Sequence, residues 1–338
     1  MRLSTMWQML GGRNARVTVQ AMRMMAPTHR VAWLAAALRH GVLAALAEAP
    51  QTFEALAQRL CPDPGGHEAL RAWLEHGVLL KQLRLRGGAY HLRGMLARRL
   101  IEPDNARVAA YVEGLAVIHH AGLFGTMDRI TAGERPSLSE LDHSLIARAS
   151  ELMAPVLREI VDDEVPTSGA VSLLELGCGT GHNVRHACER NEQLQAVGVD
   201  LDPAVSQTAR DQLASHGLSE RVEIVAGDLR TVDLQRTFDI VTMFNLIYYF
   251  PLAERGGVLE AMARHVAPGG KLVIATSCRG GTIGSNILDV WFSAMPETGP
   301  LPEPDQVVEA LSAAGLSPLP PRRPIPGEQY CVFVAQRP

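Results

Sequence analysis

Short apolar runs alternate with amphipathic segments throughout the second half of the chain. The runs are rich in Val, Ile, Leu and Ala and lie at 171–176, 196–199, 222–225, 240–244, 272–275 and 330–335. Between them, apolar residues recur at helical spacing in 183–190, 203–216, 253–265 and 305–314. Nearly continuous apolar runs are typical of strands buried on both faces of a parallel sheet. The alternation therefore predicts an α/β fold with a doubly wound, Rossmann-like sheet.

The first third of the chain has a different pattern. It contains three segments of helical periodicity: 31–48, 53–60 and 67–76. Thr52 precedes the second of these segments, in the position of an N-cap residue. Two short alternating segments, 78–85 and 89–92, then flank Gly87-Gly88 and predict a hairpin. Three helices followed by a hairpin predict a mainly α winged-helix domain in residues 1–105.

Two further helical segments, 106–130 and 138–162, follow this domain. A break at Pro166–Gly169 comes after them and marks a domain boundary. We expect residues 106–168 to form a helical linker that covers the active site, and residues 169–338 to form the catalytic domain.

A glycine-rich loop follows the first apolar run and precedes a helical segment. Its sequence is Glu175-Leu176-Gly177-Cys178-Gly179-Thr180-Gly181. Glycine permits a tight turn and a close approach of the backbone to a ligand. A dinucleotide fingerprint has the spacing GxGxxG, with the pyrophosphate at the helix N-terminus. Here the spacing is GxGxG and Glu175 stands two residues before the first glycine, so the loop is suited to an amino acid and a ribose rather than a pyrophosphate.

Other polar residues follow the next three apolar runs. Asp200, with Leu201 beside it, follows the second run, where an acid can accept both hydroxyl groups of a ribose. Asp228 follows the third run and can accept from an adenine amino group while Leu229 packs on the ring. Asn245 follows the fourth run, near the place where a cofactor and its substrate would meet. All these positions lie at strand carboxyl ends, where doubly wound sheets bind their ligands.

Residues 171–276 resemble the class I S-adenosylmethionine-dependent methyltransferases. The resemblance rests on the glycine loop, on Asp200, on Gly227-Asp228, and on Pro268-Gly269-Gly270-Lys271-Leu272 before the fifth strand. It implies a seven-stranded sheet and S-adenosylmethionine as the cofactor. The implied cofactor-binding residues are Glu175, Gly177, Cys178, Gly179, Gly181, Asp200, Leu201, Asp228, Leu229 and Asn245. A metal ion is not expected.

With the winged helix in front, the whole chain resembles the small-molecule O-methyltransferases of plants and bacteria. In that group the N-terminal domain dimerises, so the resemblance implies a homodimer and a small-molecule substrate. The segment 245–251, with Glu254-Arg255 after it, resembles a branch found in bacterial secondary metabolism. The implied activity is therefore methyl transfer in the biosynthesis of a natural product such as an antibiotic, with S-adenosylhomocysteine as the second product.

Methyl transfer is an in-line displacement at a sulfonium, in which the protein mainly excludes water and orients the nucleophile. The resembled O-methyltransferases have a histidine after the fourth strand that removes a phenolic proton, but residues 245–250 contain none. Either the nucleophile needs little help, or His119 or His120 supplies the base. Tyr248 or Tyr249 can place its aromatic ring against a cationic group of the substrate. Its hydroxyl can alternatively contact an amine. The candidate catalytic residues are the polar side chains at these strand ends: Asn245, Tyr248, Tyr249 and Thr276.

A second function on the same fold is cyclisation of the cofactor itself. The azetidine-2-carboxylate synthases resemble methyltransferases but let the amino group of S-adenosylmethionine attack its own γ-carbon, which releases methylthioadenosine. Such a site needs polar groups that fold the methionine tail, and Asn245, Tyr249 and Thr276 are suitable. Methyl transfer is far commoner on this fold and is the leading hypothesis.

The charge distribution raises a third function, a DNA-binding regulator. Residues 1–101 carry 14 basic and 5 acidic side chains, a net charge of +9, whereas the remainder carries 18 and 31, a net of −13. The predicted recognition helix, 67–76, has Arg71 as its one Lys or Arg and also contains Glu68 and Glu75. Base readout usually needs more cations than this, so we expect no nucleic-acid partner.

The remaining composition narrows the setting. The five cysteines include no CxxC pair, which argues against a disulfide framework or a zinc site and favours a reducing cytoplasm. The best candidate for a membrane helix is the apolar stretch 31–46, which is interrupted by Arg39, His40 and Gly41. We therefore expect no membrane span.

Overall fold

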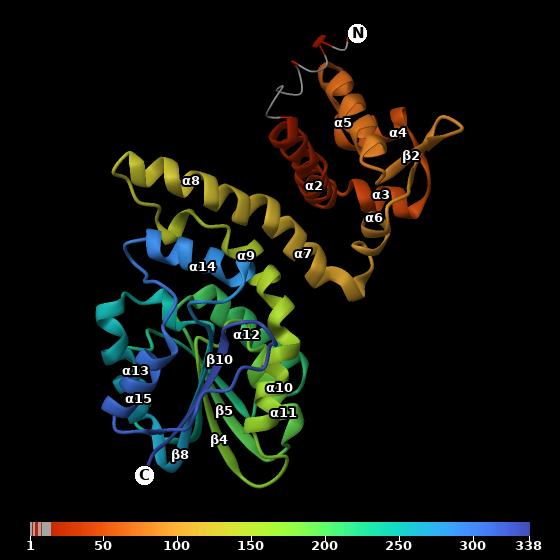
Figure 1. Cartoon of the computed structure of the whole chain (residues 1–338). Helices are drawn as coiled ribbons and strands as arrows, with labels where there is room; N and C mark the ends of the chain where they lie inside the picture. The colour runs from red at the N-terminus through yellow and green to blue at the C-terminus, as the bar shows by residue number, and fades with distance from the viewer. Residues whose placement is uncertain (1, 3, 6–7, 9–14) are drawn as a thin grey trace. The chain divides into compact units, whose positions relative to one another are not determined.

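The computed structural model describes residues 2, 4–5, 8 and 15–338, and the chain in it divides into two compact units (Figure 1). Unit 1 consists of Met1–Ala121 and Leu141–Leu152, and unit 2 consists of Gly122–Glu140 and Met153–Pro338. Residues 1–25 show a weak amphipathic helical pattern in the sequence, and part of that segment lies outside the described residues. The expected domain limits at residues 105 and 168 stay predictions.

Unit 1 is mainly helical. Its helices are α2 (Ala15–Arg39), α3 (Val42–Glu48), α4 (Phe53–Leu60), α5 (His67–Leu79), α6 (Met95–Arg99), α7 (Ala106–Gly114) and α9 (His143–Ser150), and Leu115–His119 forms a π-helical turn. A small antiparallel sheet has the order β1-β3-β2, with β1 at Gln51–Thr52, β2 at Leu83–Arg86 and β3 at Ala89–Leu92. Thr52 caps α4, as predicted, because its side chain accepts from the Ala55 amide. The predicted helices and hairpin of the winged helix are thus confirmed.

Two predicted boundaries in unit 1 were wrong. The helix predicted over 31–48 is broken at Gly41, whose left-handed φ of 71° ends α2 and starts α3 at a bend of 70°. Helix α5 continues to Leu79, three residues beyond the prediction, so the first hairpin strand begins only at Leu83. A short apolar run reads equally well as helix or strand, and tertiary packing decides between them.

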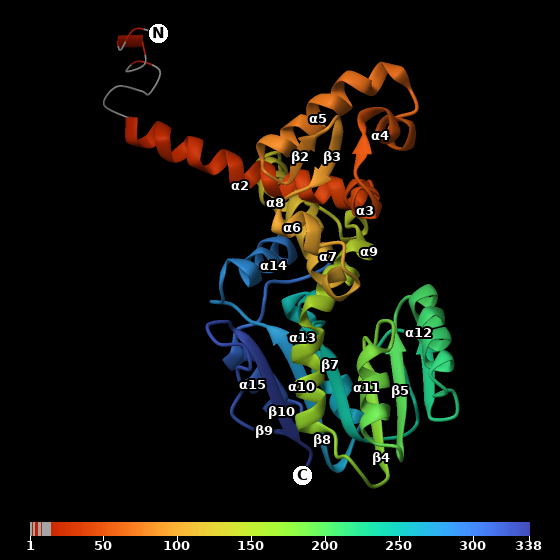
Figure 2. The same cartoon turned by 90° about the vertical axis from the view of Figure 1, so that its right-hand side faces the viewer.

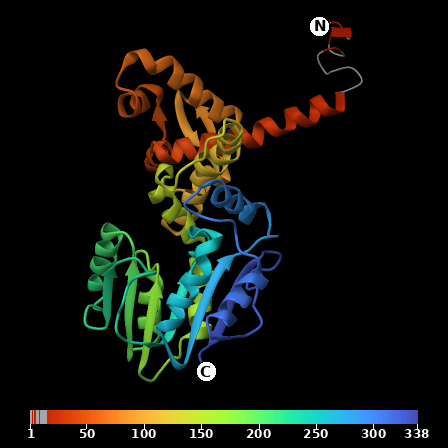
Figure 3. The ribbon, with the colours of Figure 1, turned by 90° about the vertical axis from the view of Figure 1, so that its left-hand side faces the viewer.

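Unit 2 contains a seven-stranded sheet with the order β6-β5-β4-β7-β8-β10-β9, which confirms the predicted fold class (Figures 2 and 3). The strands are β4 (Val171–Leu176), β5 (Leu194–Asp200), β6 (Val222–Ala226), β7 (Phe238–Phe244), β8 (Val266–Ser277), β9 (Ser317–Pro318) and β10 (Tyr330–Gln336). Strands β4 to β8 are parallel, and β10 pairs antiparallel with β8 and β9. The chain adds strands first on one side of β4 and then on the other, so the switch point lies between β4 and β7.

Helices cover both faces of this sheet. Helices α10 (Ala154–Glu164), α11 (His182–Arg190) and α12 (Pro203–Ser215) lie on one face, and α13 (Arg255–Arg264) and α15 (Pro304–Ala313) lie on the other (Figures 1 and 3). The core under the first set joins Ile160, Val184 and Ala209 from the helices to Leu173 and Ile240 from the strands. Burial of these apolar side chains fixes the strands whose ends carry the predicted site.

Three features of unit 2 differ from the sequence prediction. The helix predicted over 138–162 is interrupted, and α10 begins anew at Ala154, because Pro155 suits a first helical turn but not a helix interior. The two-residue strand β9 and the helix α14 (Ile283–Ala294) were not predicted. Gly122 packs so close to α14 that a Cβ there would lie 1.8 Å from the Trp291 ring nitrogen.

A helical stretch from Pro103 to Thr131, which includes α8 (His120–Thr131), is long and apolar enough to cross a membrane by length and composition alone. Within the described residues it is the one single helix that meets both criteria, and α2 with α3, bent by 70°, meets them only if the pair is taken as one span. The Pro103–Thr131 stretch nevertheless carries Glu113, which is buried and paired with Arg39 at 2.7 Å, as in a helix packed against protein.

Candidate functional site

The predicted site residues of unit 2 gather at one edge of the sheet. The parallel strands end there, and antiparallel β10 begins there, because Tyr330 at its start pairs with Ser277 at the end of β8. After the roles that the sequence predicts for these positions, we call the ends of β4, β5 and β6 the cofactor half of this edge. The ends of β7 and β8 and the start of β10 form the acceptor half.

The glycine loop after β4 has the backbone that its sequence predicts. Gly177, Gly179 and Gly181 have positive φ values of 73°, 53° and 80°. The amides of Gly177 and Cys178 both donate to the Val199 carbonyl of β5, at 2.8 and 3.0 Å. A Cβ on Gly177 would lie 2.5 Å from Leu246, whereas one on Gly179 would meet no protein atom within 4 Å. The loop is thus tight on its protein side and open at Gly179, where a ligand can approach.

Glu175 is buried beneath this loop with a half-satisfied carboxyl group. One oxygen accepts from the Asn183 side chain at 2.9 Å, and the other is buried without a well-formed hydrogen bond among the described residues. Burial is the main cause that raises the pKa of Glu175 to about 7, and the Asn183 hydrogen bond opposes it. An unsatisfied buried carboxyl oxygen requires a compensating partner, and the cationic amino group of an amino-acid ligand would be one.

Asp200 joins the end of β5 to the glycine loop. Its Oδ2 accepts from the Gly179 amide at 2.9 Å, and its Oδ1 accepts from the Asp202 amide at 3.1 Å. Asp202 itself caps α12 by accepting from the Ala204 amide at 2.8 Å. Leu201 is exposed at the same strand end. Asp200 therefore stands beside the open position at Gly179, as a ribose-binding acid would.

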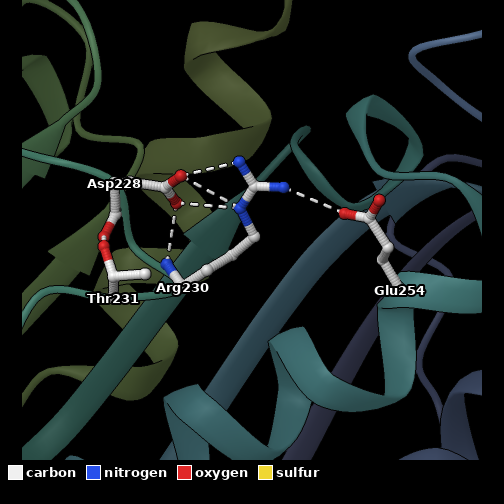
Figure 4. A network of polar contacts seen from close by, with 4 residues as sticks. All are labelled: Asp228, Arg230, Thr231 and Glu254. Carbon is white, nitrogen blue, oxygen red and sulfur yellow. Dashed lines mark hydrogen bonds and ion pairs between the residues drawn. The ribbon is translucent and has the colours of Figure 1, made fainter.

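Asp228 lies in the loop after β6, next to Asp200, because the Gly227 amide donates to the Asp200 carbonyl at 2.9 Å. Its carboxylate is held by Arg230, which also reaches Glu254 (Figure 4). These hydrogen bonds with Arg230 are the main cause that lowers the pKa of Asp228. Leu229 is buried beside them. The sequence prediction named Asp228 and Leu229 but missed Arg230, although its spacing of two residues from Asp228 was a readable signal.

The acceptor half contains phenols and an amide rather than carboxylates. Asn245 has a left-handed φ of 53°, and its backbone N–H donates to the Ala275 carbonyl of β8 at 2.8 Å. Tyr248 and Tyr249 follow in a 3-10 turn with ring centroids 5.4 Å apart. Phe292 of α14 contacts both rings, at 4.5 and 4.8 Å. Burial raises the pKa of both tyrosines, which keeps the phenols neutral near pH 7.

Tyr330 is a site candidate that the sequence reasoning missed. It is 3% exposed, and its hydroxyl is buried near the Asn245 side chain without a well-formed hydrogen bond among the described residues. Burial raises the pKa of Tyr330, and the nearby Asn245 side chain opposes that shift. Because a buried hydroxyl usually has a partner, this group is poised to hold Asn245 or a ligand. The sequence showed Tyr330 as the start of an apolar strand and gave no sign that it would face Asn245.

Four other residues that the sequence singled out have different surroundings. Thr276 is fully buried and donates to the Ser277 carbonyl at 3.3 Å. Cys178 is buried, and burial raises the pKa of its thiol, so it stays a protonated packing residue. His119 and His120, named as alternative bases, belong to unit 1, and burial lowers the pKa of His119.

The residues at this edge lie largely within a segment that is similar to known methyltransferases. Residues 173–270 match the family described as "Methyltransferase domain". The chain is 25% identical over 267 residues to demethylspheroidene O-methyltransferase of Rhodobacter capsulatus, a match that covers 74% of this chain and 65% of that protein. It is also 25% identical over 190 residues to L-tyrosine C(3)-methyltransferase of Streptomyces lavendulae, which covers 55% of this chain and 50% of that protein.

The chain thus spans about half to two thirds of the length of these curated relatives. Among solved structures, mitomycin 7-O-methyltransferase is similar with a TM-score of 0.79 and 17% identity, over 97% of this chain and all of that one. This likeness extends the shared fold from the methyltransferase domain to both units.

Proposed function

We propose that this protein transfers a methyl group from S-adenosylmethionine to a small molecule in natural-product biosynthesis. The observation that carries the proposal is the hydrogen bond between the glycine loop and Asp200. The Gly179 amide donates to the Asp200 carboxylate, and no protein atom lies within 4 Å of the place where a Gly179 side chain would begin. This arrangement suits a ribose and an amino acid side by side. The similarity to methyltransferases at this same segment supports the assignment.

In this proposal the residues of the cofactor half bind different parts of the cofactor. Glu175 takes the α-ammonium group, Asp200 the ribose hydroxyls, and Asp228 with Leu229 the adenine. The backbone of Gly177 to Gly181 would hold the methionine portion. S-Adenosylmethionine supplies the electrophilic methyl group, so the chain itself needs to bind, orient and exclude water.

The acceptor half then orients the nucleophile. Tyr248, Tyr249 and Phe292 form an aromatic wall, and Asn245 presents a neutral amide at the end of β7. No carboxylate or histidine occurs among residues 245–250. We therefore propose an acceptor whose nucleophile needs no strong base within this turn, such as an amine, a carboxylate or an acidic carbon.

We also propose that the protein acts as a cytoplasmic homodimer that associates through unit 1. Helix α2 exposes several large apolar side chains, namely Val17, Met22, Met24 and Met25, which are 56–69% exposed. Apolar side chains grouped on one helix are typical of a protein–protein contact. Size-exclusion chromatography with light scattering tests this part, and a monomer at micromolar concentration would contradict it.

The decisive experiment for the activity is incubation with S-adenosylmethionine, alone and with pooled small-molecule acceptors, followed by mass spectrometry. We expect S-adenosylhomocysteine only when an acceptor is present. Methylthioadenosine formed without any acceptor would instead establish the cyclase, which the methyltransferase relatives do not favour. Salt-sensitive retention on DNA at physiological ionic strength would instead support the DNA-binding regulator hypothesis.

A further inference from the structure

Arg230 connects two loops of the cofactor edge through a single guanidinium group. Its Nε lies 3.0 Å from each carboxylate oxygen of Asp228, and its Nη2 lies 2.6 Å from Oδ2. At its other end, Nη1 donates to Glu254 at 2.9 Å (Figure 4). Asp228 follows β6, whereas Glu254 ends the 3-10 turn Leu252–Glu254 beyond β7. One side chain therefore links the segments that follow two different strands.

The geometry restrains Asp228 more than an ordinary surface ion pair would. A planar guanidinium that meets both oxygens of a carboxylate fixes its rotation as well as its position. The backbone amide of Arg230 adds a further hydrogen bond to Oδ1 at 2.9 Å. An exposed pair usually contributes little because ordering a long side chain costs entropy. Here Glu254 and the Phe250 ring, whose centroid is 5.8 Å from the guanidinium carbon, already restrict that side chain.

We propose that Arg230 is a positioning residue, which aims the Asp228 carboxylate at the 6-amino group of the cofactor's adenine and so enforces selection against a 6-oxo purine. The inference rests on the proposed function, because it assigns the adenine to Asp228. Arg230 does not touch the base in this scheme. It acts through Asp228, with Glu254 as the second anchor.

The selection follows from hydrogen-bond chemistry. Adenine presents an amino donor to the carboxylate, whereas a 6-oxo purine presents an acceptor, so two acceptors face each other. A site that keeps its polar group in place penalises the wrong partner strongly, because that group stays unpaired. A carboxylate that is free to rotate turns toward water and discriminates less.

The test compares the affinity of the protein for S-adenosylhomocysteine and for S-inosylhomocysteine, its 6-oxo analogue, by isothermal titration calorimetry. The whole chain is used, as wild type and as Arg230→Gln, Arg230→Lys and Arg236→Gln. Arg236 is the matched control, because it makes a similarly exposed ion pair with Glu223, at 2.5 Å, in the same unit. We expect wild type to prefer the adenine ligand by roughly 100-fold, as a hydrogen bond to a charged group allows.

In Arg230→Gln that preference should fall about tenfold, and Arg230→Lys should not restore it, because a lysine lacks the planar fork. Arg236→Gln should keep the wild-type preference within about twofold, as an isolated exposed pair predicts. An unchanged preference in Arg230→Gln would overturn the inference. So would tighter binding of S-adenosylhomocysteine to that variant, which would show that Arg230 competes with the adenine for Asp228. If wild type bound neither ligand, the proposed function itself would fail.

Discussion

The two halves of the site edge differ in the charge and the burial of their side chains. The cofactor half contains three carboxyl groups, Glu175, Asp200 and Asp228, and backbone amides that are partly open to solvent. The acceptor half contains neutral groups packed against each other, with Tyr330 3% and Tyr248 6% exposed. Charged groups suit a zwitterionic, hydroxyl-rich cofactor, and a dry neutral surface suits a displacement that water would compete with. The contrast supports the proposal that cofactor recognition and methyl transfer use different halves of one sheet edge.

The largest effect that would sharpen this contrast is expected at Glu175. Its pKa of about 7 in the folded chain exceeds the unfolded value of 4.5, so the unfolded state releases its proton first as pH rises. The stability of the ligand-free protein should therefore fall between about pH 4.5 and pH 7, and the loss amounts to about 3 kcal/mol. Glu175→Gln removes this dependence. Urea unfolding at a series of pH values, with both proteins free of cofactor, measures it, and parallel curves would refute the assignment.

Asp200 should have the next largest effect, on affinity rather than on stability. Asp200→Ala removes the acceptor for the Gly179 amide and for the ribose, so S-adenosylhomocysteine should bind roughly 30-fold more weakly, or about 2 kcal/mol. Asp202→Ala is the control, since it removes only the cap of α12 and should lower stability by about 1 kcal/mol with little change in affinity. The affinities are measured by calorimetry. Equal losses of affinity in both variants would contradict the assignment of ribose binding to Asp200 and of helix capping to Asp202.

Tyr330 and Asn245 test whether the acceptor half acts separately from cofactor binding. Tyr330→Phe keeps the ring but removes the hydroxyl, so turnover should fall about tenfold while S-adenosylhomocysteine affinity stays within twofold. If Tyr330 acts through Asn245, the same change should have little further effect in an Asn245→Gly background, where glycine tolerates the positive φ. Additive effects on turnover in that double-mutant cycle would show that the two side chains act independently.

The smallest effect is expected at Cys178, in the cofactor half but without a chemical role. Burial keeps its thiol protonated, so Cys178→Ala should change S-adenosylhomocysteine affinity by no more than about threefold. Maleimide should label the half-buried Cys61 before Cys178 in the native protein. Rapid inactivation that depends on Cys178 would show a reactive thiol and break the assignment.

The same contrast explains how far the sequence could predict the structure. The cofactor half is built from short segments at strand ends, so the glycine spacing, Asp200 and Asp228 were legible as patterns. The acceptor half is assembled over long separations, since Phe292 comes from the unpredicted α14 and Tyr330 from a strand 85 residues after Asn245. Periodicity identifies such residues as apolar core and cannot show which of them face one another. Gly41 and Pro155 broke predicted helices because backbone conformation, rather than the apolar pattern, decides those positions.

A crystal structure of the protein with S-adenosylhomocysteine would test the central claim most directly. The account predicts Asp200 within hydrogen-bond distance of both ribose hydroxyls, Asp228 on the adenine amino group, and the sulfur atom directed toward Asn245. A nucleoside bound away from the Gly177–Gly181 loop, or a sulfur directed away from the acceptor half, would contradict it.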